Sequence, residues 1–266
     1  SNYRSDNCNI ESLINLKSSR LTLIKCDLKE LSLYDHCLSN VNTIIHLAGA
    51  SSPPSDNVQR FFSDNILGTA ELLKVSKSLD CQHFVFASSI SVHGEFKDSC
   101  VTQDTEIINP SAYGSSKYFC ELLLKDSFGP TNLAILRLPS VIGKGAARHW
   151  LSNVLNKAVK NETIEVYNPT SLFNNTIHIS DLCLVIERLI KIDRYKTIYL
   201  PVGAGAPVPV DAVVRLILEA VNSRSRVEYR KAKKKSFTID IELLESITRL
   251  KVRGVVEMVK EYVSEL

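Results

Sequence analysis

Tyr113 and Lys117 are the first residues whose types and spacing suggest chemistry. They are separated by three small residues in the stretch AYGSSK (112–117). Residues four positions apart share one face of a helix, so the phenol and the ammonium would project together. A free tyrosine has a pKa of about 10, and a nearby ammonium favours the phenolate. The pair therefore predicts a phenol that could transfer protons, although a YxxxK spacing also arises by chance in ordinary helices.

A second group of candidates is the hydroxyl-rich segment that follows a buried strand. In FVFASSISVHG (84–94), an apolar run leads directly into Ser88, Ser89 and Ser91. Hydroxyl groups at a strand end can bind a reacting oxygen, but they can also cap a loop. Further upstream, the apolar run TIIHL (43–47) stops at a tight Ala-Gly-Ala turn.

These side chains need a scaffold, and the apolar pattern indicates a parallel sheet. Short apolar runs at 43–47, 83–87 and 133–138 are typical of buried strands, and 21–26 (LTLIKC) is a further β-prone run. Helical spacing of apolar residues over 58–79 and 113–124 separates them. The alternation predicts an α/β, Rossmann-like, doubly wound parallel sheet with helices on both faces. Right-handed crossovers would place all strand-to-helix turns at one edge, where ligands bind in such folds.

The second half of the chain predicts a smaller α/β lobe. We expect helices over 148–160, 180–190 and 211–221, the second of them opened by a Ser-Asp cap, and strands over 162–168 and 196–202. The predicted division is an incomplete dinucleotide-binding domain over 1–145, to which part of 170–205 returns, and mainly a substrate-binding lobe over 146–266.

Composition argues against several classes of protein. The 266 residues carry a formal net charge of only +3, which does not indicate nucleic-acid binding, and the basic run RKAKKK (230–235) is interpreted as a solvated loop. No apolar run approaches the roughly 18 residues that span a bilayer. The polar start SNYRSDN is not a signal peptide. We expect a cytoplasmic protein that binds neither nucleic acid nor membranes.

No metal site is expected from the sequence. The seven cysteines are scattered and form no CxxC pair. His46 and His178 lie in apolar strand-like stretches and are interpreted as structural histidines rather than ligands, and Trp150 is interpreted as a packing residue.

The serial order of these motifs resembles the extended short-chain dehydrogenase/reductase family, which comprises NAD(P)-dependent sugar-nucleotide epimerases, reductases and dehydratases. The matching segments extend over nearly the whole chain: CDL (26–28), HLAGAS (46–51), NILGTAELL (65–73), FVFASSISVHG (84–94), NPSAYGSSKYFCELL (109–123), ILRLPSVIGKG (135–145) and NNTIHISD (174–181). Several spaced motifs in the right order are far more specific than any one of them.

The resemblance implies roles for individual residues. Tyr113 would be the catalytic acid/base, Lys117 its pKa-lowering partner and ribose anchor, and Ser89 a hydrogen-bonding partner of the reacting oxygen. Asn65 would shape the site from its helix. Besides Tyr113 and Lys117, the residues that would contact NAD or NADP are Asp27, Leu28, Ala48, Gly49, Ala50, Ser88, Pro139, Ser140 and Val141.

The resemblance also implies a nucleotide-diphosphate sugar as substrate and a homodimer formed through a helix bundle that includes the YxxxK helix. The candidate substrate contacts are Ser91, His93, Lys144, Arg148, His149, Asn153 and Asn174. Two of these depart from the family pattern. His93 replaces a usual tyrosine, and Asn174 replaces an arginine that pairs with the substrate diphosphate, so Arg148 or Lys144 would have to supply the charge.

A larger departure is that no GxxGxxG occurs in the sequence. These glycines let the backbone approach the pyrophosphate, so we expect cofactor affinity to fall sharply without them. Without the family's first two strands, the run 21–26 would be detached and the strand at 43–47 would expose an edge. We therefore expect that the native polypeptide extends upstream or that another chain covers this edge. Arg4 would be a weak candidate for a cofactor contact.

The segment after Ser89 indicates the reaction class. The family's 4,6-dehydratases carry an Asp-Glu pair there, whereas this chain has Ile90 and Ser91. Dehydration is therefore disfavoured, which leaves epimerisation or simple keto reduction and alcohol oxidation. The alternatives are a non-enzymatic Rossmann-like binding or regulatory module, an inactive truncated form, and a structural subunit that completes another chain's sheet. The sugar, the nucleotide and the choice between NAD and NADP remain open.

Overall fold

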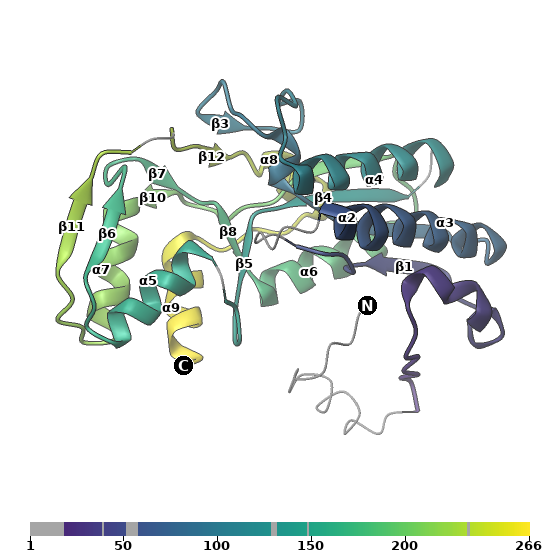
Figure 1. The fold of residues 1–266 in the computed structure, drawn as a ribbon, viewed down its shortest axis with the longest axis horizontal. Helices are drawn as coiled ribbons and strands as arrows, with labels where there is room; N and C mark the ends of the chain where they lie inside the picture. Colours follow the sequence, from purple (N-terminus) through teal and green to yellow (C-terminus); the bar gives the residue numbers. More distant parts are fainter. Residues whose placement is uncertain (1–18, 39, 52–57, 129–131, 148, 233–234) are drawn as a thin grey trace.

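The structure is a computed structural model that describes residues 19–38, 40–51, 58–128, 132–147, 149–232 and 235–266 (Figure 1). Its centre is a four-stranded sheet with the order β1-β2-β4-β9. All three strand pairings are parallel, which confirms the predicted α/β class. The strands are β1 (Thr43–His46), β2 (His83–Ser89), β4 (Leu133–Leu138) and β9 (Ile198–Pro201).

Alternation of side chains along the strands gives the sheet two buried faces. Phe84 and Phe86 of β2 pack with residues of α3 (Gly68–Ser78) and α4 (Ala112–Phe128) in one apolar cluster. Val85, between them, belongs to a second cluster with residues of α6 (Ile179–Ile190). Because successive strand residues point to opposite faces, helices must cover both sides, as Figure 1 shows.

Most of the remaining elements lie beside α3 or beyond the carboxyl ends of the strands (Figure 1). On the side of α3 lie η1 (Leu28–Cys37), α2 (Val58–Arg60) and η2 (Phe61–Leu67), and η3 (Ile90–His93) follows β2. Beyond β4, α5 (Trp150–Val159), α7 (Val210–Ala220) and α9 (Val255–Ser264) pack near the parallel pair of β6 (Ile164–Tyr167) and β11 (Val227–Arg230). Three two-stranded sheets pair β5 (Ser140–Ile142) with β8 (Thr176–His178), β7 (Leu172–Phe173) with β10 (Val208–Pro209), and β3 (Cys100–Val101) with β12 (Thr238–Ile239). The helix α8 extends over Glu242–Thr248.

Three expectations differ from the structure in detail. Residues 21–26 form no strand, because among the described residues no neighbouring strand lies alongside to supply hydrogen bonds. The helix expected over 58–79 contains a π-helical turn, η2. The helix expected over 180–190 begins at Ile179 with His178 as its N-cap, not with a Ser-Asp cap.

β1 forms one end of the described sheet and pairs only with β2 within the part of the chain that the structure describes. This arrangement agrees with the expected exposed edge. The division of the chain at residue 145 stays a prediction. No helix among the described residues is long and apolar enough to cross a bilayer.

Candidate active site

The site is a cavity at the carboxyl end of β2, with a volume of about 570 Å³. Ser89 ends the strand in an extended conformation, and its Oγ accepts a hydrogen bond from the backbone N–H of Ser91 at 3.2 Å. Tyr113 is the second residue of α4 and lines the same wall. The cavity is lined by Ser51, Ser89, Ile90, Ser91, Tyr113, Leu138, Pro139, Ser140, His149, Trp150, Tyr167, Phe173, Asn175, Val210 and Phe237.

The phenol of Tyr113 interacts with Ser89. Burial raises the pKa of the Tyr113 hydroxyl above its usual value, and the side-chain hydrogen bond with Ser89 partly opposes that rise. The ring also lies 5.7 Å from the ring of Phe61, measured between centroids. The two hydroxyls that the sequence singled out are therefore brought together at one cavity wall.

Lys117 lies one turn further along α4, but its ammonium is directed elsewhere. Its Nζ donates a hydrogen bond to the carbonyl oxygen of Ala87 at 2.9 Å and lies 4.8 Å from the centroid of the Phe86 ring. Burial lowers the pKa of the Lys117 ammonium. In this structure burial and the Ser89 hydroxyl, and not Lys117, account for the pKa of Tyr113, so the role of Lys117 as pKa-lowering partner stays a prediction.

Asn65 connects the turn after β1 to α4. Its Oδ1 accepts from the backbone N–H of Ala50 at 2.6 Å, and its Nδ2 donates to the carbonyl of Ala50 at 3.2 Å and to Ser116 Oγ at 2.9 Å. Asn65 is only 1% exposed and lies in the π-helical turn η2. Such turns re-aim side chains at functional sites. The predicted role of shaping the site has a structural basis in these three bonds.

Gly49 gives this turn its shape. Its φ of +148° is a conformation that other residues rarely adopt, and an added Cβ would lie 2.8 Å from Asn65 Oδ1 and 3.4 Å from Lys117 Nζ. A flat, side-chain-free surface therefore faces the ammonium of Lys117. Ala48 and Ala50 flank it, Ala50 being buried.

Only some of the other predicted cofactor contacts line the cavity. Pro139 and Ser140 line the cavity, whereas Val141 packs against the large apolar cluster. Ser88 faces away from the cavity, because neighbouring strand residues point to opposite sides. Its hydroxyl donates a hydrogen bond to Glu121 at 2.5 Å. Asp27 and Leu28 do not line it. Asp27 accepts from the backbone N–H of Lys29, which lowers the pKa of its carboxyl, and Leu28 packs near Gly68.

A buried polar network joins β4, α4 and the loop after β2. Arg137 of β4 binds both carboxylate oxygens of Glu121 of α4, at 3.2 and 2.9 Å. Arg137 Nη1 lies 3.4 Å from His93 Nε2. His93 is fully buried and does not line the cavity, so the structure does not place it at the predicted substrate contact. Burial lowers its pKa to about 4, which keeps the ring neutral beside the guanidinium.

The remaining predicted substrate contacts also separate into two groups. Ser91 and His149 line the cavity. Lys144 and Asn153 are exposed and do not line it, and Arg148 lies outside the described residues. Asn174 is not at the cavity either: it is 1% exposed, and its amide bonds the backbone of Ala204 and Ile239 at 2.8 to 3.0 Å. These bonds explain why an uncharged residue suits position 174.

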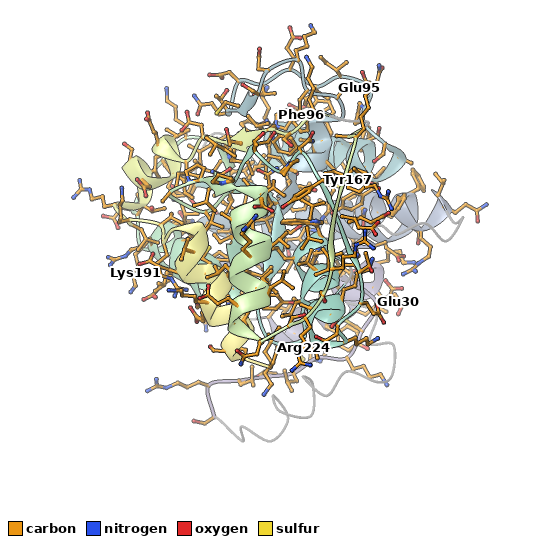
Figure 2. The ribbon with its side chains drawn as sticks, turned by 90° about the vertical axis from the view of Figure 1, so that its left-hand side faces the viewer. Glu30, Glu95, Phe96, Tyr167, Lys191 and Arg224 are labelled. Carbon is orange, nitrogen blue, oxygen red and sulfur yellow. The ribbon has the colours of Figure 1, made fainter. Side chains whose placement is uncertain are left out.

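Several cavity residues were not foreseen as contacts. Trp150 and Phe173 form a tilted aromatic pair with centroids 5.1 Å apart, and Phe237 and Tyr167 add further rings. Tyr167, labelled in Figure 2, extends from β6. Asn175 lines the cavity, and its buried Oδ1 has no hydrogen-bond partner among the described residues. Trp150 was expected only to pack. No local spacing links these residues, although the double Asn at 174 and 175 was a visible polar interruption.

Comparisons with known proteins agree with this architecture. Low-salt glycan biosynthesis protein Agl12 of Haloferax volcanii is 23% identical over 212 residues, which cover 77% of this chain and 68% of that protein. A UDP-glucose 4-epimerase of Haemophilus influenzae is 35% identical over 95 residues, which cover 34% of this chain and only 27% of that protein.

Solved structures share the fold. MoeE5 in complex with UDP-glucose and NAD has a TM-score of 0.78 and 24% identity, with 96% of this chain and 93% of that chain covered. A UDP-glucuronic acid 4-epimerase from Bacillus cereus in complex with NAD has a TM-score of 0.80 and 20% identity, with 97% and 83% covered. The family model described as the NAD dependent epimerase/dehydratase family matches residues 3–198. Because this match covers most of the chain, the protein belongs to the NAD dependent epimerase/dehydratase family.

Proposed function

We propose that this protein is an NAD(P)-dependent epimerase or reductase that acts on a nucleotide-diphosphate sugar. The observation that carries the proposal is the shared cavity wall of Ser89 and Tyr113, with their side chains hydrogen-bonded at the carboxyl end of β2. Family membership supports the reaction class, and solved relatives in complex with UDP-glucose or UDP-glucuronic acid support the substrate class.

The residues present fit one half of the dinucleotide. The open surface left by Gly49, the ammonium of Lys117 beside it, and Pro139 at the cavity would hold the ribose and the nicotinamide. The glycine-rich turn for the pyrophosphate does not occur in this sequence. When bound, NAD supplies the group that accepts a hydride from the sugar carbon and returns it.

In the proposed mechanism, Tyr113 removes the proton from a sugar hydroxyl and later gives it back. Ser89 holds the same oxygen as an alcohol and as a ketone. Lys117 would favour the phenolate once its ammonium leaves the Ala87 carbonyl, because an opposite charge nearby lowers a phenol's pKa. Active-site hydrogen bonds often tighten only when substrate binds, so the resting position of Lys117 is compatible with this role.

The second wall of the cavity would bind the substrate. The rings of Trp150, Phe173 and Phe237 offer apolar surface to a nucleoside, and His149 and Asn175 offer polar groups to the diphosphate and the sugar. Burial lowers the pKa of His149, so it would act there as a neutral hydrogen-bonding group. The homodimer stays a prediction, which the sedimentation of the purified protein tests.

The test compares Tyr113→Phe with Tyr118→Phe. Both substitutions remove one hydroxyl from α4, but Tyr118 does not line the cavity. With UDP-glucose and UDP-glucuronic acid as substrates and NAD present, we expect Tyr113→Phe to lower turnover by about 100-fold or more, the scale of general acid–base catalysis. Tyr118→Phe should leave turnover unchanged. Equal turnover in the two variants would remove the proposed role of Tyr113.

A second candidate is a binding module without turnover. The observation that favours it is the ammonium of Lys117, which is hydrogen-bonded to the carbonyl oxygen of Ala87. Calorimetric titration separates the two candidates. Binding of NAD and of UDP with turnover supports the enzyme, whereas binding of UDP without binding of NAD supports the module.

A further inference from the structure

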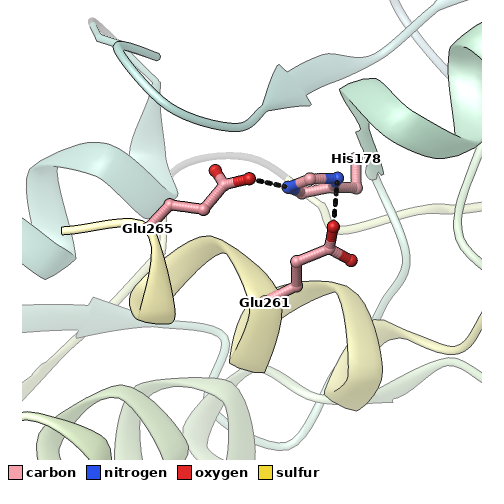
Figure 3. Close-up of side chains that lie close together, drawn as sticks. All are labelled: His178, Glu261 and Glu265. Atoms are coloured by element: carbon pink, nitrogen blue, oxygen red, sulfur yellow. Dashed lines mark ion pairs between the residues drawn. The ribbon is translucent and has the colours of Figure 1, made fainter.

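A cluster of His178, Glu261 and Glu265 lies apart from the catalytic cavity (Figure 3). His178 ends β8, and the two glutamates lie one helical turn apart near the end of α9, facing the imidazole. Each residue offers a ligand atom, and these atoms all lie within 4.8 Å of one another. None of the three residues lines the catalytic cavity.

The hydrogen bonds at Ser180 indicate which nitrogen of His178 is free. Nδ1 lies 2.7 Å from Ser180 Oγ, which also accepts from Arg253 Nη2 at 2.7 Å and donates to Glu261 at 3.4 Å. A hydroxyl has one proton and two lone pairs, so these contacts are all satisfied when Nδ1 carries the imidazole proton. The backbone N–H of Ser180 points at Nδ1 from 3.3 Å, and this longer contact is the one that the Nδ1-protonated tautomer gives up. With Nδ1 protonated, Nε2 presents a lone pair to Glu265.

That lone pair is buried and unsatisfied. The side chain of His178 is 1% exposed, and neither its Nε2 nor Glu265 Oε2 has a hydrogen-bond partner within the described part of the chain. With Nδ1 protonated, the Nε2 lone pair and the carboxylate of Glu265 face each other in a buried site, an arrangement that a cation between them would stabilise.

The distance between Glu265 and Nε2 matches a shared ion better than a direct bond. Glu265 Oε1 lies 3.4 Å from Nε2. Glu261 Oε1 lies 3.5 Å from the other ring nitrogen, Nδ1, and an oxygen of Glu261 lies within 4.8 Å of the ligand atoms of the other two residues. N–H···O hydrogen bonds span about 2.7–3.2 Å. Two ligands bound tetrahedrally to one Zn²⁺ at about 2.0–2.2 Å from the ion lie about 3.4 Å apart.

The local charge is also negative. Arg253 pairs with both Asp181, at 2.5 Å, and Glu261. Glu265 has no ion-pair partner other than His178 among the described residues. One arginine therefore faces three carboxylates, which leaves negative charge for a divalent ion to balance.

We propose that His178 Nε2, Glu265 and Glu261 bind one divalent transition-metal ion of the Zn²⁺ class. Imidazole and carboxylate are ligands that such ions accept, and Ser180 acts as the hydrogen-bonding partner that orients the ring. The ion joins the end of α9 to the strand that opens α6, so its role is structural. This inference revises the sequence-based expectation that His178 is not a ligand.

The test titrates Zn²⁺ into the chelator-treated protein by calorimetry and follows Co²⁺ binding by its visible absorption. We expect one ion per chain, the intense bands of a tetrahedral Co²⁺ site, and a higher melting midpoint. Glu265→Gln should weaken binding by at least about 100-fold, because loss of outer-shell partners alone accounts for about 10- to 100-fold. His178→Ala should abolish binding.

The controls are His36→Ala and Glu219→Gln, which remove an exposed imidazole and an exposed carboxylate elsewhere. Neither should change the affinity. Should His178→Ala fail to fold, Glu265→Gln decides, since it keeps the side-chain volume. Substoichiometric binding, unchanged affinity in Glu265→Gln, or an equal loss in a control would overturn the proposal. A His178 Nε2 proton that persists in NMR spectra with Zn²⁺ present would also overturn it.

Discussion

The buried pair of Arg137 and Glu121 allows a quantitative test of how α4, the helix that carries Tyr113, is held against the sheet. Arg137 and Glu121 have 6% and 0% of their side chains exposed, and the guanidinium donates to both carboxylate oxygens. Arg137→Met keeps most of the apolar volume but leaves Glu121 buried, with the Ser88 hydroxyl as its remaining donor among the bonds described. Removing one partner of a buried pair typically destabilises a protein by about 3–5 kcal/mol.

The assay is urea denaturation of Arg137→Met, Glu121→Leu and the double variant. We expect each single variant to lose about 3–5 kcal/mol of unfolding free energy, and the double variant to lose less than the sum, because no uncompensated charge remains. Lys191→Met is the control: its pair with Glu187 has 63% and 51% of the side chains exposed. Such a pair contributes about 0–1 kcal/mol. A loss below about 1 kcal/mol in Arg137→Met would refute the reasoning.

Two further predictions concern the edge of the sheet. Gly49→Ala should reduce NAD affinity by at least about tenfold and destabilise the fold by about 1–3 kcal/mol, because the new Cβ would lie 2.8 Å from Asn65 Oδ1 at a φ of +148°. Calorimetry measures the affinity, and thermal melting measures the stability. A variant that binds NAD normally would contradict the proposed contact. Burial lowers the pKa of His46 from 6.5 to about 3 in the folded protein. The unfolded chain therefore binds more protons between those values, so stability should be full above pH 6.5 and fall as the pH decreases toward 3. His46→Asn should flatten that dependence in denaturation curves taken from pH 7 to 4, and an unchanged slope would show that His46 is not responsible.

The proximity of Ser89 and Tyr113 could be predicted from the sequence because their positions depend on local rules. An apolar run that enters a hydroxyl-rich loop predicts Ser89 at a strand end, and a tyrosine at a helix start predicts Tyr113 nearby once right-handed crossovers are assumed. The parallel pairing of the strands was predicted from the alternation of apolar runs and helical spacing. The structure confirms the parallel sheet.

Side-chain direction was harder to predict. Ser88 and Ser89 are neighbours, yet one faces Glu121 and the other the cavity, because strand residues alternate between faces. His93 was expected at the substrate but is buried beside Arg137. Lys117 has the predicted spacing, but a backbone carbonyl and an aromatic ring determine where its ammonium lies.

Contacts between distant segments were decided only by the tertiary structure. Phe173 and Phe237 complete the cavity from short strand regions whose sequences carry no periodic signal. His178 meets Glu261 and Glu265 across more than 80 positions of sequence, as α9 packs against β8. The sequence alone determined which residues end strands and begin helices, since propensity and apolar period act over a few residues. Packing of the helices against the sheet decided which of those residues face a common space, because that choice depends on contacts that local sequence does not encode.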